Sequence, residues 1–272
     1  PRGIGKKLLV DHLLNYFYSK NNEQFYNLKS NEYNQNNNLS KMISANTHPN
    51  IFKIKKKKDK KIIDIDQIRE MIQFTNQTSF NNDRRFIVIE DINLMGINSA
   101  NALLKSIEEP NNNTYYILIN NSEFKILETI KSRCLEFKSN LKNSEVVEIV
   151  NYYFNSDIYN EINLDFINNY NSPSFLISLV NFLESSDLSI KECNIEDLLT
   201  YVIKNKIYTS DEFIKEYLNL FIELFFYKNI NNSKKISFKI KKYFYQKLSF
   251  VKKYNLDFES FFLEFNEKLL SE

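Results

Sequence analysis

Two short apolar runs, with a helical stretch between them, constrain the fold of this chain more than any other feature. The runs are residues 86–89 and 115–119, and the stretch between them places Ala102, Leu103 and Ile107 on one side at helical spacing. Pro110 ends that helix, because proline cannot continue it. This order predicts a buried strand, a helix and a second buried strand, as in a parallel α/β sheet.

Polar residues follow both predicted strands. Glu90 and Asp91 come directly after the first strand, and Asn120 comes after the second. In open α/β sheets, ligands bind at the carboxyl ends of the strands. The three residues are therefore candidate ligand-binding residues, with the cap of a following helix as the alternative role for the two acids.

The start of the sequence indicates a phosphate-binding loop. Gly3, Gly5 and Lys6 match the end of the pattern G-x-x-x-x-G-K-[ST], in which backbone N–H groups and the lysine hold phosphate at a helix N-terminus. Lys7 stands where the pattern has Ser or Thr, whose hydroxyl binds Mg²⁺. The alternative is a glycine-containing turn before a helix.

The elements around this loop follow from the same patterns. The helix after the loop is predicted to bury Leu9, Leu13, Tyr16 and Phe17. A strand is predicted at residues 51–54, and Asp64 is predicted to cap the helix that comes next. The sequence begins inside the loop motif without an initiator Met, so we expect the first strand of the sheet to be missing.

Residues 90–110 and the later Ser132-Arg133-Cys134 together resemble the clamp-loader branch of the AAA+ ATPases. The shared pattern is N-A-L-L-K-x-[LI]-E-E-P, here at residues 101–110, followed by S-R-C at residues 132–134. The resemblance covers residues 1–180 through motifs and the rest through element order. It implies an α/β fold followed by an all-α part: an AAA+ P-loop domain with a parallel sheet, a three-helix lid and a helical collar.

The resemblance places the α/β domain at residues 1–140, the lid at 141–185 and the C-terminal collar, an oligomerisation domain, at 186–272. Within the lid, Asn143 or Ser144 is predicted to cap a helix that extends to Phe154, and a second helix is predicted at 164–170. A third helix is predicted to begin with Ser172 as cap and Pro173 in its first turn. Apolar stripes predict collar helices around 195–202, 213–224, 238–250 and 258–269.

The resemblance also assigns roles at the nucleotide site. In the family the strand before the acids ends in Asp-Glu, which orients Mg²⁺ and polarises the attacking water, whereas here the order is Glu90-Asp91. Asn120 stands at the sensor-1 position, and Phe175 replaces the sensor-2 arginine. These departures imply a degenerate site that requires no cofactor and no metal and that could retain ATP or ADP without hydrolysis; its residues are Gly3, Gly5, Lys6, Lys7, Glu90, Asp91 and Asn120.

Arg133, between Ser132 and Cys134, is implied to be an arginine finger. In the family this arginine crosses a subunit interface and completes the ATP site of the neighbouring subunit. Its planar guanidinium suits bidentate contact with phosphate oxygens. A surface ion pair is the alternative for any single arginine, and Cys134 is interpreted as a small buried apolar residue rather than a nucleophile.

Composition limits the other functions that the chain can have. A net charge of +2 is too small to indicate nucleic-acid binding by itself, and two distant cysteines form neither a disulfide framework nor a metal cluster. Residues 21–47 contain no cysteine and His48 is interpreted as a turn residue, so we expect no zinc. No apolar run reaches the length of a membrane span and no signal peptide is visible, which favours the cytoplasm.

A basic stretch at residues 53–61 contains seven lysines. Such a run is usually a solvated loop, and contact with DNA phosphates is the alternative. If the second alternative holds, this chain contacts nucleic acid directly.

Losses at the chain's own nucleotide site, beside an intact S-R-C, resemble the delta prime branch of the family. The implied role is that of a stator without ATPase activity in a hetero-pentamer with gamma/tau-like and delta-like subunits. That complex places the sliding clamp on primed DNA for the replicative DNA polymerase III. The first alternative is a working gamma/tau-like ATPase, and the second is a nucleic-acid-binding AAA+ adaptor that uses residues 53–61.

Overall fold

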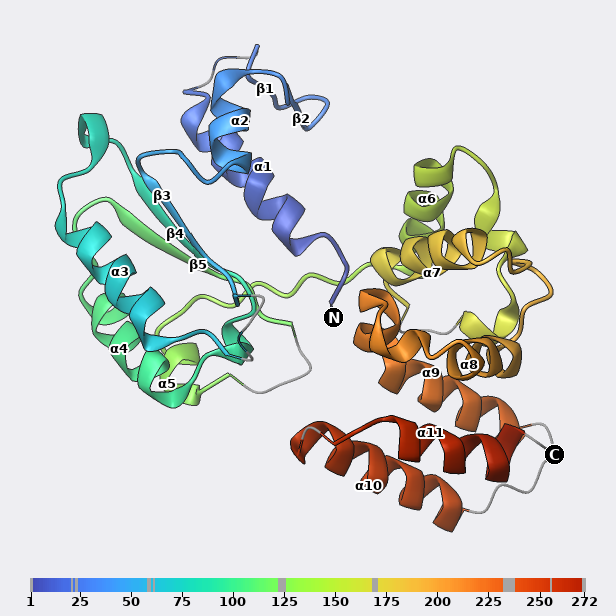
Figure 1. The fold of residues 1–272 in the computed structure, drawn as a ribbon. Helices are drawn as coiled ribbons and strands as arrows, with labels where there is room; N and C mark the ends of the chain where they lie inside the picture. Colours follow the sequence, from blue (N-terminus) through green and yellow to red (C-terminus); the bar gives the residue numbers. More distant parts are fainter. Residues whose placement is uncertain are drawn as a thin grey trace. The chain divides into compact units, whose positions relative to one another are not determined.

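The computed structural model describes residues 2–20, 22, 24–57, 60, 62–121, 126–167, 171–231, 238–254 and 256–270. The chain divides into two compact units, Pro1–Asn140 and Leu141–Glu272, and Figure 1 shows the elements of both. Hydrophobic clusters form separately within each unit. Each unit therefore has a core of its own.

A three-stranded parallel sheet in the order β3-β4-β5 organises the first unit. Its strands are β3 (Ile51–Ile54), β4 (Arg85–Ile89) and β5 (Thr114–Leu118). All five residues of the central strand β4 are buried, as expected for a strand that is covered on both faces. The predicted α/β class and the predicted succession of strand, helix and strand are confirmed. The prediction that the second of these strands is buried is wrong in part, because β5 is only partly buried.

Helices cover both faces of this sheet (Figure 1). On one face α3 (Ile65–Asn76) and α4 (Ile97–Glu108) pack over Ile87 and Ile89. On the other face α1 (Lys6–Tyr18) and α2 (Asn38–Ser44) pack over the alternate strand residues. The period of two along β4 thus supplies apolar side chains to two separate core layers.

Local signals explain how several of these elements begin and end. Asp64 is the N-cap of α3, as predicted, and its N–H donates to Gln67 Oε1 at 3.3 Å in a capping box. Helix α4 ends at Glu108, in agreement with the predicted stop before Pro110. The remaining elements of the first unit are short: β1 (Tyr26–Asn27), β2 (Glu32–Tyr33), α5 (Glu128–Lys131) and the 3₁₀ turns η1 (Phe80–Asn82) and η2 (Ile92–Leu94).

The predicted buried face of α1 is wrong in part. Leu9 and Leu13 are 63% and 38% exposed, whereas Val10 and Leu14 are buried. Helix α1 has apolar residues on more than one side, and its sequence alone does not determine which side is buried. The buried side is the one that packs against the sheet residues Phe86 and Val88. Phe17, which was predicted correctly, lies on that side and its ring centroid is 5.2 Å from that of Phe86 in β4.

The second unit is helical and has one continuous hydrophobic cluster. Ser172 caps α7 and Pro173 begins it, as predicted, because the Phe175 N–H donates to Ser172 Oγ at 3.3 Å. The helices are α6 (Asn143–Phe154), α7 (Pro173–Ser185), α8 (Ile195–Lys204), α9 (Glu212–Asn231), α10 (Phe238–Tyr254) and α11 (Glu259–Phe265), with short turns η3 (Ile158–Glu161), η4 (Leu164–Phe166), η5 (Ile207–Thr209) and η6 (Asn266–Leu270).

Two predictions for the region 141–185 are wrong. The helix predicted at 164–170 is only the 3₁₀ turn η4, because Ile167 is already extended; residues 168–170 lie outside the described part. The N-cap of α6 is Lys142 rather than Asn143 or Ser144, and the Lys142 N–H donates to Glu145 Oε2 at 2.6 Å. The predicted boundary between lid and collar stays a prediction.

Candidate functional site

The phosphate-binding loop leads directly into α1. Gly5 is the N-cap residue of α1 and has a left-handed backbone with φ of 85°, which glycine adopts without steric cost. No side chain caps the helix there, and its first turn contains no acidic residue. The backbone N–H groups at this helix end, with the positive end of the helix dipole, can therefore face an anion.

Two consecutive lysines tie this loop to the carboxyl ends of the strands. Lys6 Nζ donates to the backbone oxygen of Asn120, just after β5. Lys7 Nζ lies 3.2 Å from Glu90 Oε1, directly after β4, and the side chains are 61% and 19% exposed. These contacts bring four of the predicted site residues together beside the N-terminal end of α1.

Asp91, the second acid after β4, contacts Asn121, a residue that the sequence analysis did not select. The side-chain amide of Asn121 donates to Asp91, whose backbone is left-handed with φ of 52°. Asn120 Oδ1 is buried and accepts no hydrogen bond from the part of the chain that the structure describes. A buried polar atom without a partner is uncommon in folded proteins.

Arg133 lies away from that cluster, on the turn after α5. Its Nε donates to Glu108 Oε1 at 2.5 Å, and its Nη1 donates to the Thr129 carbonyl oxygen at 2.8 Å and to Ser132 Oγ at 3.2 Å. The Arg133 and Glu108 side chains remain 37% and 44% exposed. None of these partners belongs to the phosphate-binding loop, so the predicted site residues form two separate groups.

Two further motif positions contribute apolar side chains. Cys134 is half-buried against the core of the first unit, and burial raises the pKa of its thiol, which disfavours the nucleophilic thiolate. Phe175, at the predicted sensor-2 position, is 1% exposed and packs on Tyr217 with ring centroids 5.0 Å apart. This position supplies no polar contact to a ligand.

The basic stretch at 53–61 is less uniform than the sequence indicates. Lys53 belongs to β3, and its 8%-exposed side chain places Nζ 2.8 Å from Asp11 Oδ1 and 3.1 Å from the Ile43 carbonyl oxygen. Lys60 Nζ lies 2.6 Å from Asp64 Oδ2. Residues 58, 59 and 61 lie outside the described part. Lys53 is therefore not part of a solvated loop, and its charge serves the packing of α1 on the sheet.

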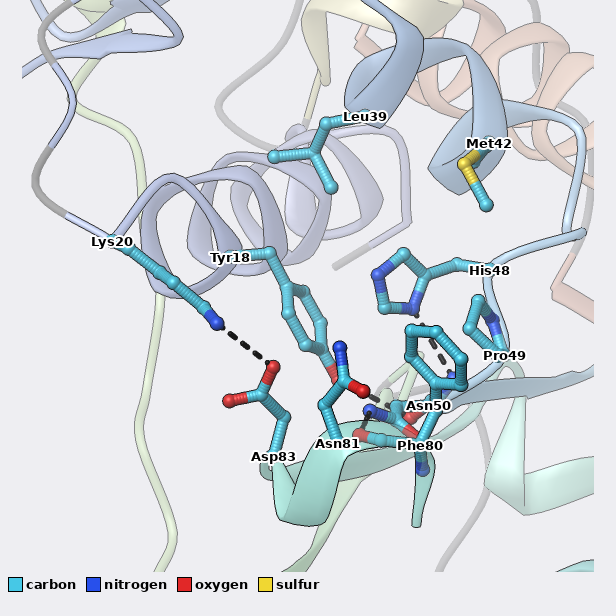
Figure 2. Close-up of a pocket in the computed structure, with 10 residues that line it drawn as sticks. All are labelled: Tyr18, Lys20, Leu39, Met42, His48, Pro49, Asn50, Phe80, Asn81 and Asp83. Carbon is cyan, nitrogen blue, oxygen red and sulfur yellow. Dashed lines mark hydrogen bonds and ion pairs between the residues drawn. The ribbon is translucent and has the colours of Figure 1, made fainter.

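A pocket of about 290 Å³ lies at the opposite, amino end of the sheet (Figure 2). The His48 ring packs against the Tyr18 ring at a tilt of 43°, with centroids 4.2 Å apart, and His48 Nδ1 accepts the Asn50 N–H at 3.2 Å. Burial lowers the pKa of His48 and so favours its neutral form. The residue is the turn residue that the sequence predicted, and the pocket contains none of the predicted nucleotide-site residues.

The residues that the structure describes contain no group of three or more His, Cys, Asp or Glu side chains that could hold a metal ion. They also contain no helix that is both long and apolar enough to cross a membrane. The expected absence of zinc stays a prediction.

Comparison with known proteins gives a consistent set of relatives. The family model described as "DNA polymerase III, delta subunit" matches residues 1–142. DNA polymerase III subunit delta' of Pseudomonas aeruginosa is 39% identical over 95 residues, or 35% of this chain and 29% of that protein. The same subunit of Buchnera aphidicola subsp. Schizaphis graminum is 31% identical over 168 residues, or 61% and 49%.

More distant likenesses extend to gamma subunits. A gamma subunit-related protein of DNA polymerase III from Thermotoga maritima is 19% identical, over 76% of this chain and 67% of that chain, with a TM-score of 0.39, which is too low to support an argument.

The chain spans under half of the length of the two delta' relatives, 29% and 49%. Because the family model covers more than half of the chain, the protein belongs to the DNA polymerase III delta subunit family.

Proposed function

We propose that this chain is a delta prime-like clamp-loader subunit that lends Arg133 to a neighbouring ATPase and does not hydrolyse ATP at its own site. It acts in the cytoplasm as a stator within a hetero-pentamer that contains gamma/tau-like and delta-like subunits. That complex loads the sliding clamp onto primed DNA. The proposal is supported by the family and by relatives that are delta' subunits. The observation that carries it is the contrast between Lys7 and Arg133.

Lys7 and Glu90 argue against hydrolysis at the chain's own site. Mg²⁺ requires oxygen ligands, and the loop position that normally supplies a hydroxyl carries an ammonium. That ammonium is 3.2 Å from the Glu90 carboxylate, at the strand end that would hold the metal. A fixed positive charge there repels a divalent cation, so the residues present do not fit Mg²⁺.

Two other residues also argue against ATP hydrolysis at the chain's own site. Asp91 stands where the motif has glutamate, and its shorter side chain, which accepts a hydrogen bond from Asn121, reaches less far toward an attacking water. Phe175 is buried and cannot replace the sensor-2 arginine. Gly5 and the uncapped end of α1 still suit a phosphate. The site is thus compatible with nucleotide that is held without turnover, and no cofactor is required for the proposed role.

Arg133 supports the second half of the proposal. Its guanidinium is exposed, and its ion-pair partner Glu108 is exposed as well. Exposed pairs of this kind contribute only about 0–1 kcal/mol to stability. A phosphate of a neighbouring subunit can therefore replace Glu108 at little cost, and Glu108 keeps the guanidinium on the surface in the free subunit.

The decisive experiment is Arg133→Ala in a complex reconstituted with the chain's own gamma/tau-like and delta-like partners. ATP hydrolysis at the affected site should fall about 1000-fold, as for other arginine fingers. Arg69→Ala is the matched control, because Arg69 is also an exposed arginine, 2.9 Å from Asp66. Unchanged hydrolysis in the Arg133 variant contradicts the finger role.

A second measurement tests the gamma/tau-like alternative. The isolated chain should show no ATP turnover above that of its Lys6→Ala variant. Substantial turnover that disappears in Lys6→Ala would show a working ATPase and would contradict the stator role.

A further inference from the structure

Charges in the second unit are strongly segregated along the sequence. Residues 224–256 contain nine lysines and no acidic residue, whereas the rest of residues 141–272 contains 19 acidic residues and six lysines. Helix α10 lies inside the basic segment. Part of its charge is neutralised, since Lys247 pairs with Glu264 of α11. At helical spacing, Lys239, Lys242 and Lys253 lie on one side of the helix.

That side, here named the α10 outer face, combines aromatic rings with lysines. Phe244, Leu248 and Val251 bury the opposite side of the helix in the core of the unit. At 3.6 residues per turn, the outer face occupies an arc of about 120°. Its exposed residues are Lys239, Lys242, Tyr243, Gln246, Phe250, Lys253 and Tyr254.

The rings of the outer face are partly exposed. The Tyr243 hydroxyl donates to Glu264 of α11, and Lys268 Nζ lies 5.4 Å from the Tyr243 ring centroid, so Phe250 and Tyr254 are the rings that remain open for stacking. Tyr243, Phe250 and Tyr254 are 45%, 52% and 58% exposed. Phe250 and Tyr254 are stacked, with ring centroids 6.0 Å apart and an interplanar angle of 26°. Lys253 Nζ lies 5.2 Å from the centroid of the Tyr254 ring. Flat π-surfaces next to ammonium groups are therefore presented together to solvent.

We propose that the α10 outer face binds single-stranded nucleic acid, in which bases stack on Phe250 and Tyr254 while Lys242 and Lys253 contact phosphates. Stacking rings beside a basic track are what sequence-independent single-strand binding requires, and the absence of acids on this helix complements a polyanion. The inference goes beyond the proposed function, because it uses neither Arg133 nor the nucleotide site.

The structure favours nucleic acid over an anionic membrane surface. A helix that lies in a membrane interface inserts a broad apolar face. The apolar face of α10 is already occupied by the core. The outer face has rings separated by Gln246 and lysines, so it offers stacking surfaces rather than an apolar patch.

Binding of fluorescently labelled oligo(dT) to the whole chain, followed by anisotropy, tests the stacking part. Phe250→Ala and Tyr254→Ala should each weaken binding about tenfold, within the range for loss of one base–ring stack. Tyr152→Ala is the control, because Tyr152 is 83% exposed on α6 of the same unit. Equal loss in Tyr152→Ala, or no oligo(dT) binding at low salt, overturns the proposal.

The charge part is tested by the salt dependence. Lys242→Gln/Lys253→Gln should reduce the slope of log K against log salt by about 1.4, or 0.7 for each phosphate contact. The matched control Lys204→Gln/Lys215→Gln, at exposed lysines of α8 and α9, should leave the slope unchanged. Binding to phosphatidylserine vesicles without binding to oligo(dT) overturns the proposal. Arg133→Ala should retain wild-type oligo(dT) affinity, so the two proposals fail separately.

Discussion

The two ends of the same parallel sheet are built from different chemistry. At the amino end, the buried groups are neutral and satisfy one another, beside one exposed ion pair between Lys20 and Asp83. Asn50 Nδ2 donates to the Phe80 carbonyl oxygen at 2.9 Å, and the Phe80 N–H donates to Asn50 Oδ1 at 2.7 Å (Figure 2). The Tyr18 hydroxyl donates to the Arg84 carbonyl oxygen at 2.6 Å. At the carboxyl end, charged groups face one another and Asn120 Oδ1 has no described partner. The first end serves folding, and the second retains groups for a ligand.

The same substitution at both ends gives the sharpest version of this comparison. Asn50→Ala should lower the free energy of unfolding by about 2–3 kcal/mol, because a 1%-exposed amide that closes two hydrogen bonds is lost. Asn120→Ala should change it by less than about 0.5 kcal/mol, because its buried oxygen has no hydrogen bond to lose. Urea unfolding of both variants measures the difference, and equal losses would contradict the comparison.

The amino end should also respond to pH. Burial lowers the pKa of His48 in the folded chain below its ordinary value of 6.5, so the unfolded chain binds the proton more readily. Stability should therefore be complete above pH 6.5 and should fall as the pH drops from there through the folded pKa. The slope cannot exceed about 1.4 kcal/mol per pH unit for one proton.

His48→Asn is the control for this effect. Asparagine keeps an acceptor for the Asn50 N–H in an Asx turn but does not titrate. The variant should be less sensitive to acid than the wild type between pH 6.5 and 5 in urea unfolding. If both proteins lose the same free energy of unfolding between pH 6.5 and 5, folding does not lower the pKa of His48 and the prediction is wrong.

The smallest expected effect compares one ion pair from each end. The Lys7–Glu90 pair should give a coupling energy of about 1 kcal/mol in a double-mutant cycle, because Glu90 is 19% exposed. The Lys20–Asp83 pair, at 3.0 Å with side chains 66% and 33% exposed, should give about 0.3 kcal/mol. Both couplings should weaken in high salt. A larger coupling for Lys20–Asp83 would reverse the comparison.

Much of the fold could be predicted because its signals are local. The apolar run of β4, the Pro110 stop and the Ser172-Pro173 start each act over a few residues, and each element is found in the structure. The buried face of α1 could not be predicted, because apolar residues lie on more than one side of this helix. Which side is buried depends on how the helix packs against the sheet. The helix expected at 164–170 is only a 3₁₀ turn: Asn163 Oδ1 accepts the Asp165 N–H at its start, and Ile167 already has an extended backbone.

The candidate site was predicted as single residues rather than as pairs. Lys7 and Glu90 were each recognised as departures from a motif, but their contact depends on the packing of α1 against the sheet. Glu108 was recognised only as part of the sequence motif at residues 101–110, although its carboxylate forms the ion pair with Arg133. Asn121 carried no signal beyond its place at a strand end. Contacts between residues so distant in sequence follow from tertiary structure.

The ion pair between Lys53 and Asp11 changes how strongly the neighbouring lysines act at a distance. The electrostatic potential that guides a polyanion during diffusional encounter depends on net charge, and salt screens it within about 10 Å. Lys53 and Lys60 are each offset by a carboxylate of the same unit. The net charge near β3, and with it the rate at which a polyanion would approach this edge of the sheet, is therefore lower than a count of the lysines suggests.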